Sequence, residues 1–340
     1  MGKILVICNV LAAFYFVGCK NGGFSSSTGT SGDSSTVTVS VKSNQTIGSW
    51  PHTIDYYIPS NATTAIVFLH GGGGKKEGFA YNLGIKSDNT TSTYAASSDA
   101  QSWLINQKVV AIFPQGQTFA GNNWTWSNYV MTSGENDVSF LQDLVVSIKS
   151  DSSLGNITKV YVVGHSNGGM MVNRMWCESP STFDGYVSFA GPPAPTLSGC
   201  APSSIKPYMI VVGDTDQVLQ TSGNMAATQW TIKPILVAAE PTAWVDTVPK
   251  VLNEKVYYPT RIATACGETM GSGSTSGQIT TWTNCSGTIK LQVIAQTTIN
   301  GSVSGGDHCL ATASYPCNTT LTGTTGLDPK TAAVDFLKSF

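Results

Sequence analysis

Short apolar runs recur along the chain and are separated by polar or helix-patterned stretches. The runs are rich in β-branched residues and mostly unbroken, which is typical of parallel strands buried on both faces. Helical patterns occur between them at 137–148 and 167–176. This alternation predicts one α/β domain over 36–340, a mostly parallel sheet with helices on both faces. The predicted strands are 36–41, 66–69, 109–113, 160–163, 208–212 and 291–295.

The pattern weakens between residues 220 and 265, where Trp230, Trp244 and four prolines occur. Long irregular insertions that lie beside a functional site are often functional themselves. We therefore expect this segment to be either a lid or substrate wall, or a surface excursion with a small core of its own.

The N-terminal residues have the pattern of a secretory signal, expected over 1–19. Lys3 precedes an apolar stretch that is too short to cross a bilayer. Residues 16–19, Phe-Val-Gly-Cys, resemble a bacterial lipobox, so Cys19 is expected to carry a lipid; plain secretion and an uncleaved anchor are the alternatives. Residues 20–35 are rich in Gly and Ser and predict a tether. The chain should be exported, as a cell-envelope lipoprotein or a secreted protein.

Composition excludes several classes of protein. The 340 residues are 41% hydrophobic and 11% charged, against the ~25% charge of an average soluble domain, which excludes a disordered chain or a coiled coil. A net charge of -2 leaves no excess of Lys or Arg for phosphates, so no nucleic-acid partner is expected.

Cysteine usage agrees with export. An even set of cysteines lies beyond the predicted signal, as expected for disulfides in an oxidising compartment. The set lacks the close C-x-x-C pairs that are typical of structural zinc, so no metal site is expected. Many pairings are possible, and short loops favour Cys177–Cys200, Cys266–Cys285 and Cys309–Cys317.

The strongest chemical signal is Gly-His-Ser-Asn-Gly at 164–168, which follows a predicted strand and opens a predicted helix. In a G-x-S-x-G turn the glycines let the chain turn sharply. The serine then stands exposed above the N-terminus of a helix, which favours developing negative charge. Ser166 is therefore the candidate nucleophile, and the strand–turn–helix context indicates an α/β-hydrolase fold.

A serine nucleophile needs a base, and the chain has four histidines. His52 lies before the first core strand, and His70 opens a glycine run. His165 lies inside the turn and should point away from where Ser166 reacts. His308 remains, and it follows the nucleophile in sequence, as this fold requires of its base.

The acid should lie between the nucleophile and the base, directly after a strand. The segment Gly213-Asp214-Thr215-Asp216 offers two carboxylates in this position. Asp216 is favoured, because Asp214 directly follows a glycine and can serve as a turn residue. The carboxylate would fix the tautomer of His308 and stabilise its cation.

Two backbone N–H groups are the candidate oxyanion donors. Asn167 supplies one because it follows the nucleophile. The glycine run at 71–74 supplies the other, with Gly72 as the candidate, since glycines let the backbone approach a substrate closely.

Several motifs occur in order along the chain: His70-Gly71-Gly72, Phe113-Pro114-Gln115-Gly116, Trp124-Thr125-Trp126, Asn136 to Phe140, Gly164 to Gly169, Cys177 through Cys200, Gly213 to Asp216, and Gly306-Asp307-His308. Together they resemble the polyhydroxybutyrate depolymerase and feruloyl esterase group of α/β-hydrolases, over about residues 55–308. The resemblance implies a triad of Ser166, Asp216 and His308 and a disulfide between Cys177 and Cys200. It also implies that the segment with Trp124 and Trp126 borders the active-site cleft; packing of both rings in the core is the alternative.

We therefore expect a serine hydrolase that cleaves carboxylic esters through an acyl-enzyme, without a cofactor. The resemblance implies polyester or oligomeric hydroxyalkanoate substrates. Feruloyl or acetyl esters of plant polysaccharide are an alternative, as are the β-diketone polymers cleaved by the similar oxidised polyvinyl alcohol hydrolases. A binding lipoprotein that has kept only the hydrolase fold is the non-enzymatic alternative. Besides the substrate, the expected partner is a membrane, reached through a lipid on Cys19.

Overall fold

The computed structural model describes residues between Val37 and Phe340. The predicted signal at 1–19, the tether at 20–35 and the possible lid at 220–265 lie outside the described residues and stay predictions. The described ranges are 37–119, 123–128, 133–191, 202–213, 266–268, 273–295, 297–299, 302–304, 308 and 327–340.

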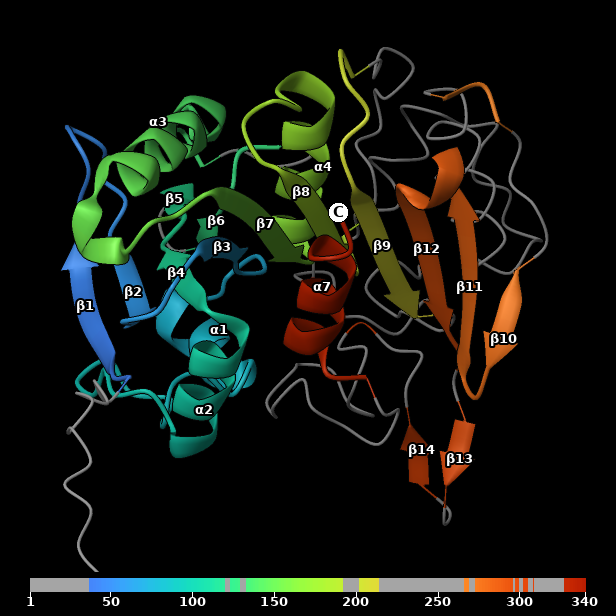
Figure 1. Ribbon diagram of the computed structural model, residues 1–340, viewed down its shortest axis with the longest axis horizontal. Helices are drawn as coiled ribbons and strands as arrows, with labels where there is room; N and C mark the ends of the chain where they lie inside the picture. The colour runs from blue at the N-terminus through green and yellow to red at the C-terminus, as the bar shows by residue number, and fades with distance from the viewer. Residues whose placement is uncertain are drawn as a thin grey trace, which may run out of the picture. The chain divides into compact units, whose positions relative to one another are not determined.

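A ten-stranded sheet organises the described part of the chain (Figure 1). From edge to edge it contains β1 (Val39–Gln45), β2 (Ile54–Pro59), β4 (Val109–Pro114), β3 (Thr64–Leu69), β7 (Lys159–His165), β8 (Gly185–Phe189), β9 (Tyr208–Gly213), β12 (Ile289–Ile294), β11 (Ile279–Asn284) and β10 (Ser274–Ser276). The strands from β4 to β12 are parallel to one another, and the outer strands are antiparallel to their neighbours. Among the described residues, two hairpins lie outside this sheet: β5 (Gln117–Phe119) with β6 (Asn123–Thr125), and β13 (Thr297–Ile299) with β14 (Ser302–Ser304).

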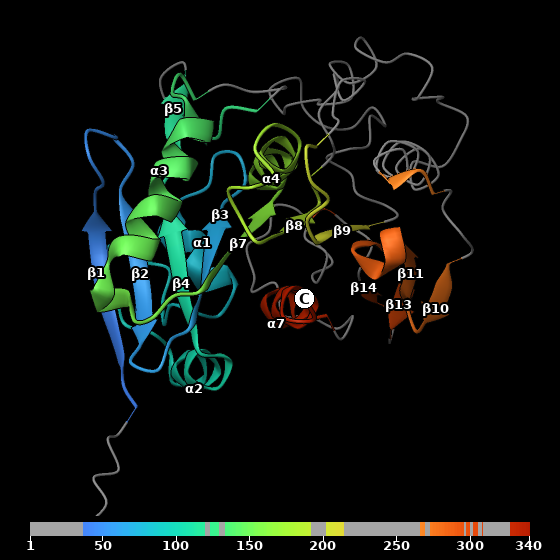
Figure 2. The same cartoon turned by 45° about the horizontal axis from the view of Figure 1, so that its top comes forward.

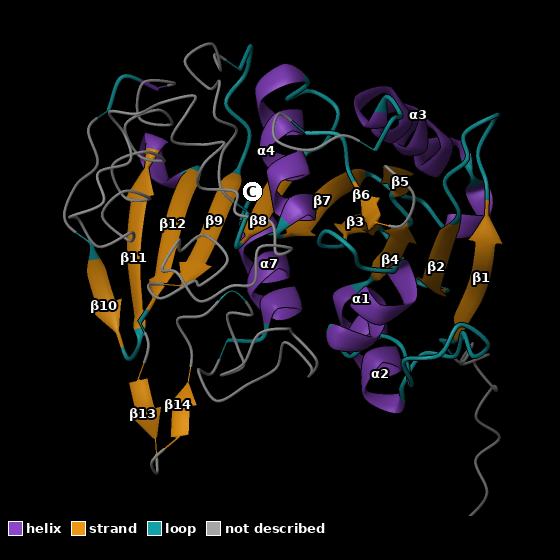
Figure 3. Cartoon of the chain, turned by 180° about the vertical axis from the view of Figure 1, so that it is seen from behind, coloured by secondary structure: helices purple, strands orange, loops and turns teal. Residues whose placement is uncertain are grey.

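Helices cover both faces of the sheet, as Figures 1 and 3 show from opposite sides. The helices α3 (Asp137–Ser150) and α4 (Asn167–Glu178) pack on one face. The other face carries α1 (Lys76–Asn82), α2 (Ser98–Gln107) and α7 (Pro329–Leu337). The tilted view of Figure 2 separates α4 and α7 on opposite sides of β8.

The central strands have two buried faces because their side chains alternate between two cores. In β7, Val160 and Val162 pack on the side of α3 and α4, whereas Tyr161 and Val163 pack on the side of α1, α2 and α7. A strand buried in this way is apolar at most of its positions. The unbroken apolar runs in the sequence therefore mark these strands.

The fold is the predicted α/β-hydrolase fold. The predicted strands at 66–69, 109–113, 160–163 and 208–212 correspond to β3, β4, β7 and β9. The predicted helices correspond to α3 and α4. The hydrophobic pattern of the sequence does not predict β2, β8, β11, α1, α2 or α7.

The two edges of the sheet are formed by β1 and β10. The pairing of β1 with β2 is irregular between Lys42 and Gln45, and Asn44 there has a φ of 50°. The ammonium of Lys42 lies 3.2 Å from the carboxylate of Asp151. At the opposite edge, the three residues of β10 are all exposed.

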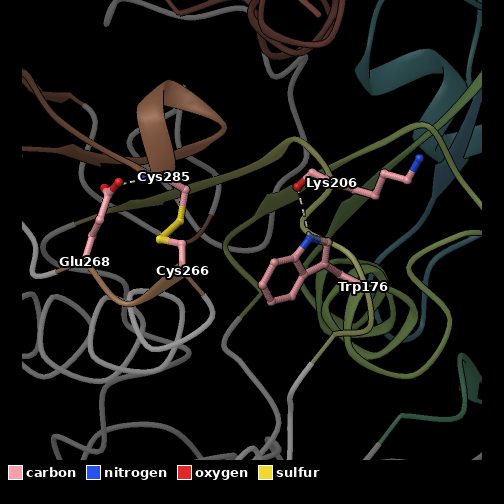
Figure 4. The surroundings of a disulfide bond; sticks show 5 residues. All are labelled: Trp176, Lys206, Cys266, Glu268 and Cys285. Atoms are coloured by element: carbon pink, nitrogen blue, oxygen red, sulfur yellow. Dashed lines mark hydrogen bonds between the residues drawn. A yellow bond between two sulfur atoms is a disulfide. The ribbon is translucent and has the colours of Figure 1, made fainter.

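A disulfide joins Cys266 to Cys285, the pair favoured by the sequence analysis, with a Cα–Cα distance of 5.8 Å (Figure 4). The Cys285 N–H donates to Glu268 Oε2 over 2.7 Å, so two interactions connect these segments. Cys177 is also disulfide-bonded. Its expected partner Cys200 lies outside the described residues. Among the helices that the structure describes, none is long and apolar enough to cross a membrane.

Candidate active site

Ser166 lies at a sharp turn between β7 and α4. Its backbone has φ 55° and ψ -121°, a sparsely populated conformation that costs roughly 1–3 kcal/mol. The turn requires glycine on both sides. A Cβ on Gly164 would lie 2.2 Å from the Gly168 carbonyl oxygen, and a Cβ on Gly168 would lie 2.2 Å from the Leu69 carbonyl oxygen. The turn leaves the serine side chain partly exposed at the N-terminus of α4.

The structure brings the predicted base to the predicted nucleophile. His308 Nε2 lies 2.8 Å from Ser166 Oγ, although the two residues are 142 positions apart. With Nδ1 protonated, the imidazole accepts the serine proton at Nε2. The side chain of His308 is buried. This pair has the geometry of a nucleophile and its general base.

His165 contacts the backbone of the base. Its Nε2–H donates to the His308 carbonyl oxygen over 2.9 Å, and the two ring centroids are 5.1 Å apart. Because His165 is the last residue of β7, this contact ties His308 to the strand that presents Ser166. From the sequence alone, His165 is expected to point away from the reaction and has no predicted role. The contact joins residues 143 positions apart, so no local signal reveals it.

The glycine loop after β3 lies against the nucleophile. A Cβ on Gly71 would be 3.2 Å from Ser166 Cβ, and a Cβ on Gly72 would be 3.5 Å from Asn167 Cβ. The loop turns back through a hydrogen bond from the Gly74 N–H to the Gly71 carbonyl oxygen. The Gly72 N–H has no acceptor among the residues that the structure describes. It can therefore donate to a ligand oxygen, as predicted for one oxyanion donor.

His70 holds the glycine loop as a neutral imidazole. Burial lowers the pKa of His70 to about 4, and the hydrogen bond to Gly71 only partly opposes this effect. The neutral ring donates through Nδ1 to the Gly71 carbonyl oxygen over 2.8 Å. Its Nε2 accepts from the Gly116 N–H over 2.9 Å. His70 therefore positions the loop and is not available as a base.

The two candidate tryptophans differ in burial. Trp124, on β6, is partly exposed and remains a candidate for substrate binding. Trp126 has no exposed surface. Its ring stacks with those of His52 and Phe140 in the core. The structure therefore assigns Trp126 to the core, which corrects the expectation that it binds substrate.

The remaining histidine, His52, has a structural environment. Its Nε2 lies 2.8 Å from Asp137 Oδ1, and neither side chain has exposed surface. Its ring stacks on Phe140 with centroids 3.7 Å apart. In the described part of the chain, no group of three or more His, Cys, Asp or Glu side chains could hold a metal ion.

The candidate acids follow β9, a strand that runs parallel to β7, so the carboxyl ends of both strands lie at the same end of the sheet. β9 ends at Gly213, directly before Asp214, and only β8 separates β9 from the parallel strand β7. The carboxyl ends of β7 and β9 are therefore roughly 10 Å apart. Asp214 and Asp216 themselves lie outside the described residues. The same holds for the predicted residues Cys19, Cys200, Cys309 and Cys317.

No protein-family model matches the sequence. No curated protein matches it either. The resemblance to the depolymerase and feruloyl esterase group therefore stays a prediction.

Among solved structures, the chain is similar to an acetyl xylan esterase from Aspergillus awamori, at 15% identity and a TM-score of 0.48, over 75% of this chain and 92% of the esterase. It is similar to esterase PE8 at 15% identity and a TM-score of 0.46, over 84% of this chain and 96% of PE8. It is also similar to the siderophore hydrolase EstA from Aspergillus nidulans, at 10% identity and a TM-score of 0.44, over 94% of this chain and 100% of EstA. Likeness at this level says nothing about the activity of this chain.

Proposed function

We propose that this protein is a serine hydrolase that cleaves carboxylic esters through an acyl-enzyme. The observation that carries the proposal is the 2.8 Å contact between His308 Nε2 and Ser166 Oγ at a strained turn. A serine hydroxyl is a weak nucleophile unless an adjacent base removes its proton, and this contact supplies that base.

In the first half of the proposed reaction, His308 Nε2 takes the proton from Ser166 Oγ while Oγ bonds to the substrate carbonyl carbon. The carbonyl oxygen gains negative charge. The N–H groups of Gly72 and Asn167 donate to it, and the N-terminus of α4 favours it electrostatically. The bond from carbon to the alcohol oxygen then breaks, and His308 gives its proton to that oxygen.

In the second half, water replaces the alcohol. His308 takes a proton from water while the water oxygen attacks the acyl carbon. The bond between that carbon and Ser166 Oγ breaks, His308 returns the proton to Oγ, and the carboxylic acid leaves. Asp216, with Asp214 as the alternative, would hold the imidazole in the required tautomer.

We propose polyester or oligomeric hydroxyalkanoate esters as the substrates. The support is the set of sequence motifs that resemble the depolymerase group, together with the partly exposed Trp124 on β6. Purified protein should be assayed on polyester film, a feruloyl ester, acetylated xylan and acetylacetone. The highest kcat/KM on polyester supports this assignment, and a preference for any other member of the panel replaces it.

We also propose that the chain is exported and anchored through a lipid on Cys19. The support is the apolar N-terminal segment followed by Gly18 and Cys19. In a bacterial host, the wild-type protein should fractionate with membranes, and Cys19→Ser should release it. If both proteins are found in the medium, plain secretion is correct.

The hydrolase mechanism is tested with a fluorophosphonate probe, which reacts only with an activated serine. The wild-type protein should be labelled, and peptide mapping should place the label on Ser166. Ser166→Ala should abolish labelling and lower turnover by about 10⁴-fold or more. Ser179→Ala, at the other end of α4, is the matched control and should behave as the wild type. An unlabelled wild-type protein, or a folded Ser166→Ala variant that keeps its turnover, would refute the mechanism.

A further inference from the structure

The two proposed oxyanion donors belong to different parts of the chain. Gly72 lies in the loop after β3, and Asn167 is the first residue of α4. An oxyanion is stabilised only when both N–H groups reach the same oxygen, at about 2.7–3.1 Å. The separation of the two segments must therefore be fixed by other contacts.

Trp126 contacts the segment that carries the second donor. The backbone N–H of Trp126 donates to Asn167 Oδ1 over 2.8 Å. In return, Asn167 Nδ2 donates to the backbone carbonyl oxygen of Trp126 over 3.4 Å. The side-chain amide of Asn167 thus bonds both backbone polar groups of a single residue. Both residues are buried, so water does not compete for these groups.

The same short segment also contacts the glycine loop. The indole Nε1–H of Trp126 donates to the His70 carbonyl oxygen over 3.1 Å. The Gly73 N–H donates to the Trp124 carbonyl oxygen over 2.7 Å. These two bonds flank Gly72 in the sequence. The segment 124–126 is therefore hydrogen-bonded to both halves of the proposed oxyanion site.

We propose that Trp126 and the side chain of Asn167 are positioning residues, which set the separation of the Gly72 and Asn167 N–H groups. This inference rests on the proposed hydrolase function. The rigid indole of Trp126 spans from the backbone held by Asn167 to the carbonyl group of His70. A side chain with no rotatable bond beyond χ2 suits a fixed distance. The buried ring of Trp126 thus acts on the reaction through the backbone groups around it.

We call the hydrogen bonds that connect Trp126 to Asn167 and to His70 the brace. Loss of the brace should lower kcat with little change in KM. The oxyanion forms only in the transition state, so misplaced donors weaken an interaction that the bound substrate does not yet make fully. A misplacement of about 1 Å can cost ~100-fold in rate. Loss of global stability alone would instead lower the amount of active protein and leave both constants of the folded fraction unchanged.

Trp126→Phe tests the brace because it removes the indole N–H and keeps an aromatic ring. Trp176→Phe is the matched control. Trp176 is also buried, and its Nε1–H donates to the Lys206 carbonyl oxygen over 3.2 Å (Figure 4). It lies in the last turn of α4, at the opposite end of the helix from Ser166. Both variants lose the same atoms and the same type of hydrogen bond.

Steady-state kinetics on a soluble ester should show kcat lowered by ~10- to 100-fold in Trp126→Phe, with KM within ~2-fold. Trp176→Phe should keep both constants within ~2-fold of the wild type, with active sites counted by probe titration. Asn167→Ala keeps its backbone N–H and should lower kcat in the same way. The double variant Trp126→Phe with Asn167→Ala should lose much less than the product of the two effects, because both act on one brace.

The outcomes separate this inference from the proposed function. A wild-type protein without esterase activity or probe labelling refutes the hydrolase itself. An active wild type refutes the brace alone if Trp126→Phe keeps its kcat, if Trp176→Phe loses as much, or if the two effects multiply. If Trp126→Phe does not fold, an unchanged kcat in Asn167→Ala overturns the brace and a lowered kcat with normal KM supports it.

Discussion

Acidification should destabilise this protein through His70, the neutral histidine of the glycine loop. Burial lowers its folded-state pKa to about 4, from an ordinary value of 6.5. Because the unfolded chain binds this proton more readily, the contribution of His70 to stability is present above pH 6.5 and is lost as the pH falls towards 4. The side chain is almost fully buried, so solvent does not screen the effect.

The size of the loss follows from the two pKa values. Each pH unit between them corresponds to about 1.4 kcal/mol of differential proton binding. The His70 contribution to the free energy of unfolding should therefore fall by about 2 kcal/mol between pH 7.5 and pH 5, and by about 3 kcal/mol at pH 4. Protonation would also remove the acceptor of the Gly116 N–H, so the glycine loop should open first.

The assay is urea unfolding across this pH range for the wild type and His70→Asn. Asparagine can still donate to the Gly71 carbonyl oxygen but cannot titrate. The variant should be less stable at pH 7.5, since the Gly116 N–H loses its acceptor. This deficit should shrink by about 2 kcal/mol at pH 5. If the free energies of unfolding of the two proteins change with pH in parallel, His70 is not a neutral, buried histidine.

Four further substitutions test the site. Gly168→Ala should abolish probe labelling and lower the melting temperature by several degrees, because its Cβ would lie 2.2 Å from a backbone oxygen; a labelled, stable variant contradicts the turn geometry. His165→Ala removes one hydrogen bond to His308, worth about 1 kcal/mol, and should lower kcat about 5-fold in steady-state assays; an unchanged kcat removes its positioning role. Asp216→Asn should lower turnover by ~10⁴-fold, whereas Asp214→Asn should mainly lower stability, and the reverse ranking would make Asp214 the acid.

Local pattern was enough for the central strands β3, β4, β7 and β9 and for the turn at Ser166. Those strands are buried on both faces, so most of their positions are apolar and the run stands out in the sequence. β2 was not predicted because it carries Asp55 in a buried strand. The carboxylate of Asp55 is held 2.8 Å from Lys76 Nζ, and this partner on α1 is not evident from the sequence around the strand.

The site was predictable where the fold restricts the choice of residue. One serine lies in the strand–turn–helix motif, and elimination among four histidines leaves His308 as its partner. The contacts of His165 and Trp126 were not predictable, since they join segments that are far apart in the chain. An aromatic residue after a short hairpin can face either substrate or core. Only the packing of Trp126 against His52 and Phe140 decides between them.

The edges of the sheet bear on self-association of the folded protein. An exposed strand with free N–H and C=O groups is a template for pairing with another chain, and aggregation often starts there. β10 offers only three polar residues, Ser-Thr-Ser, and β1 is interrupted between Lys42 and Gln45. Neither of these edges, as formed by the described residues, is long, flat and apolar, so a concentrated solution should resist strand-to-strand oligomers. An engineered Lys42→Val would remove the charge from β1 and place a second valine beside Val41 on an open edge, which makes this lysine a position to preserve when the protein is produced at high yield.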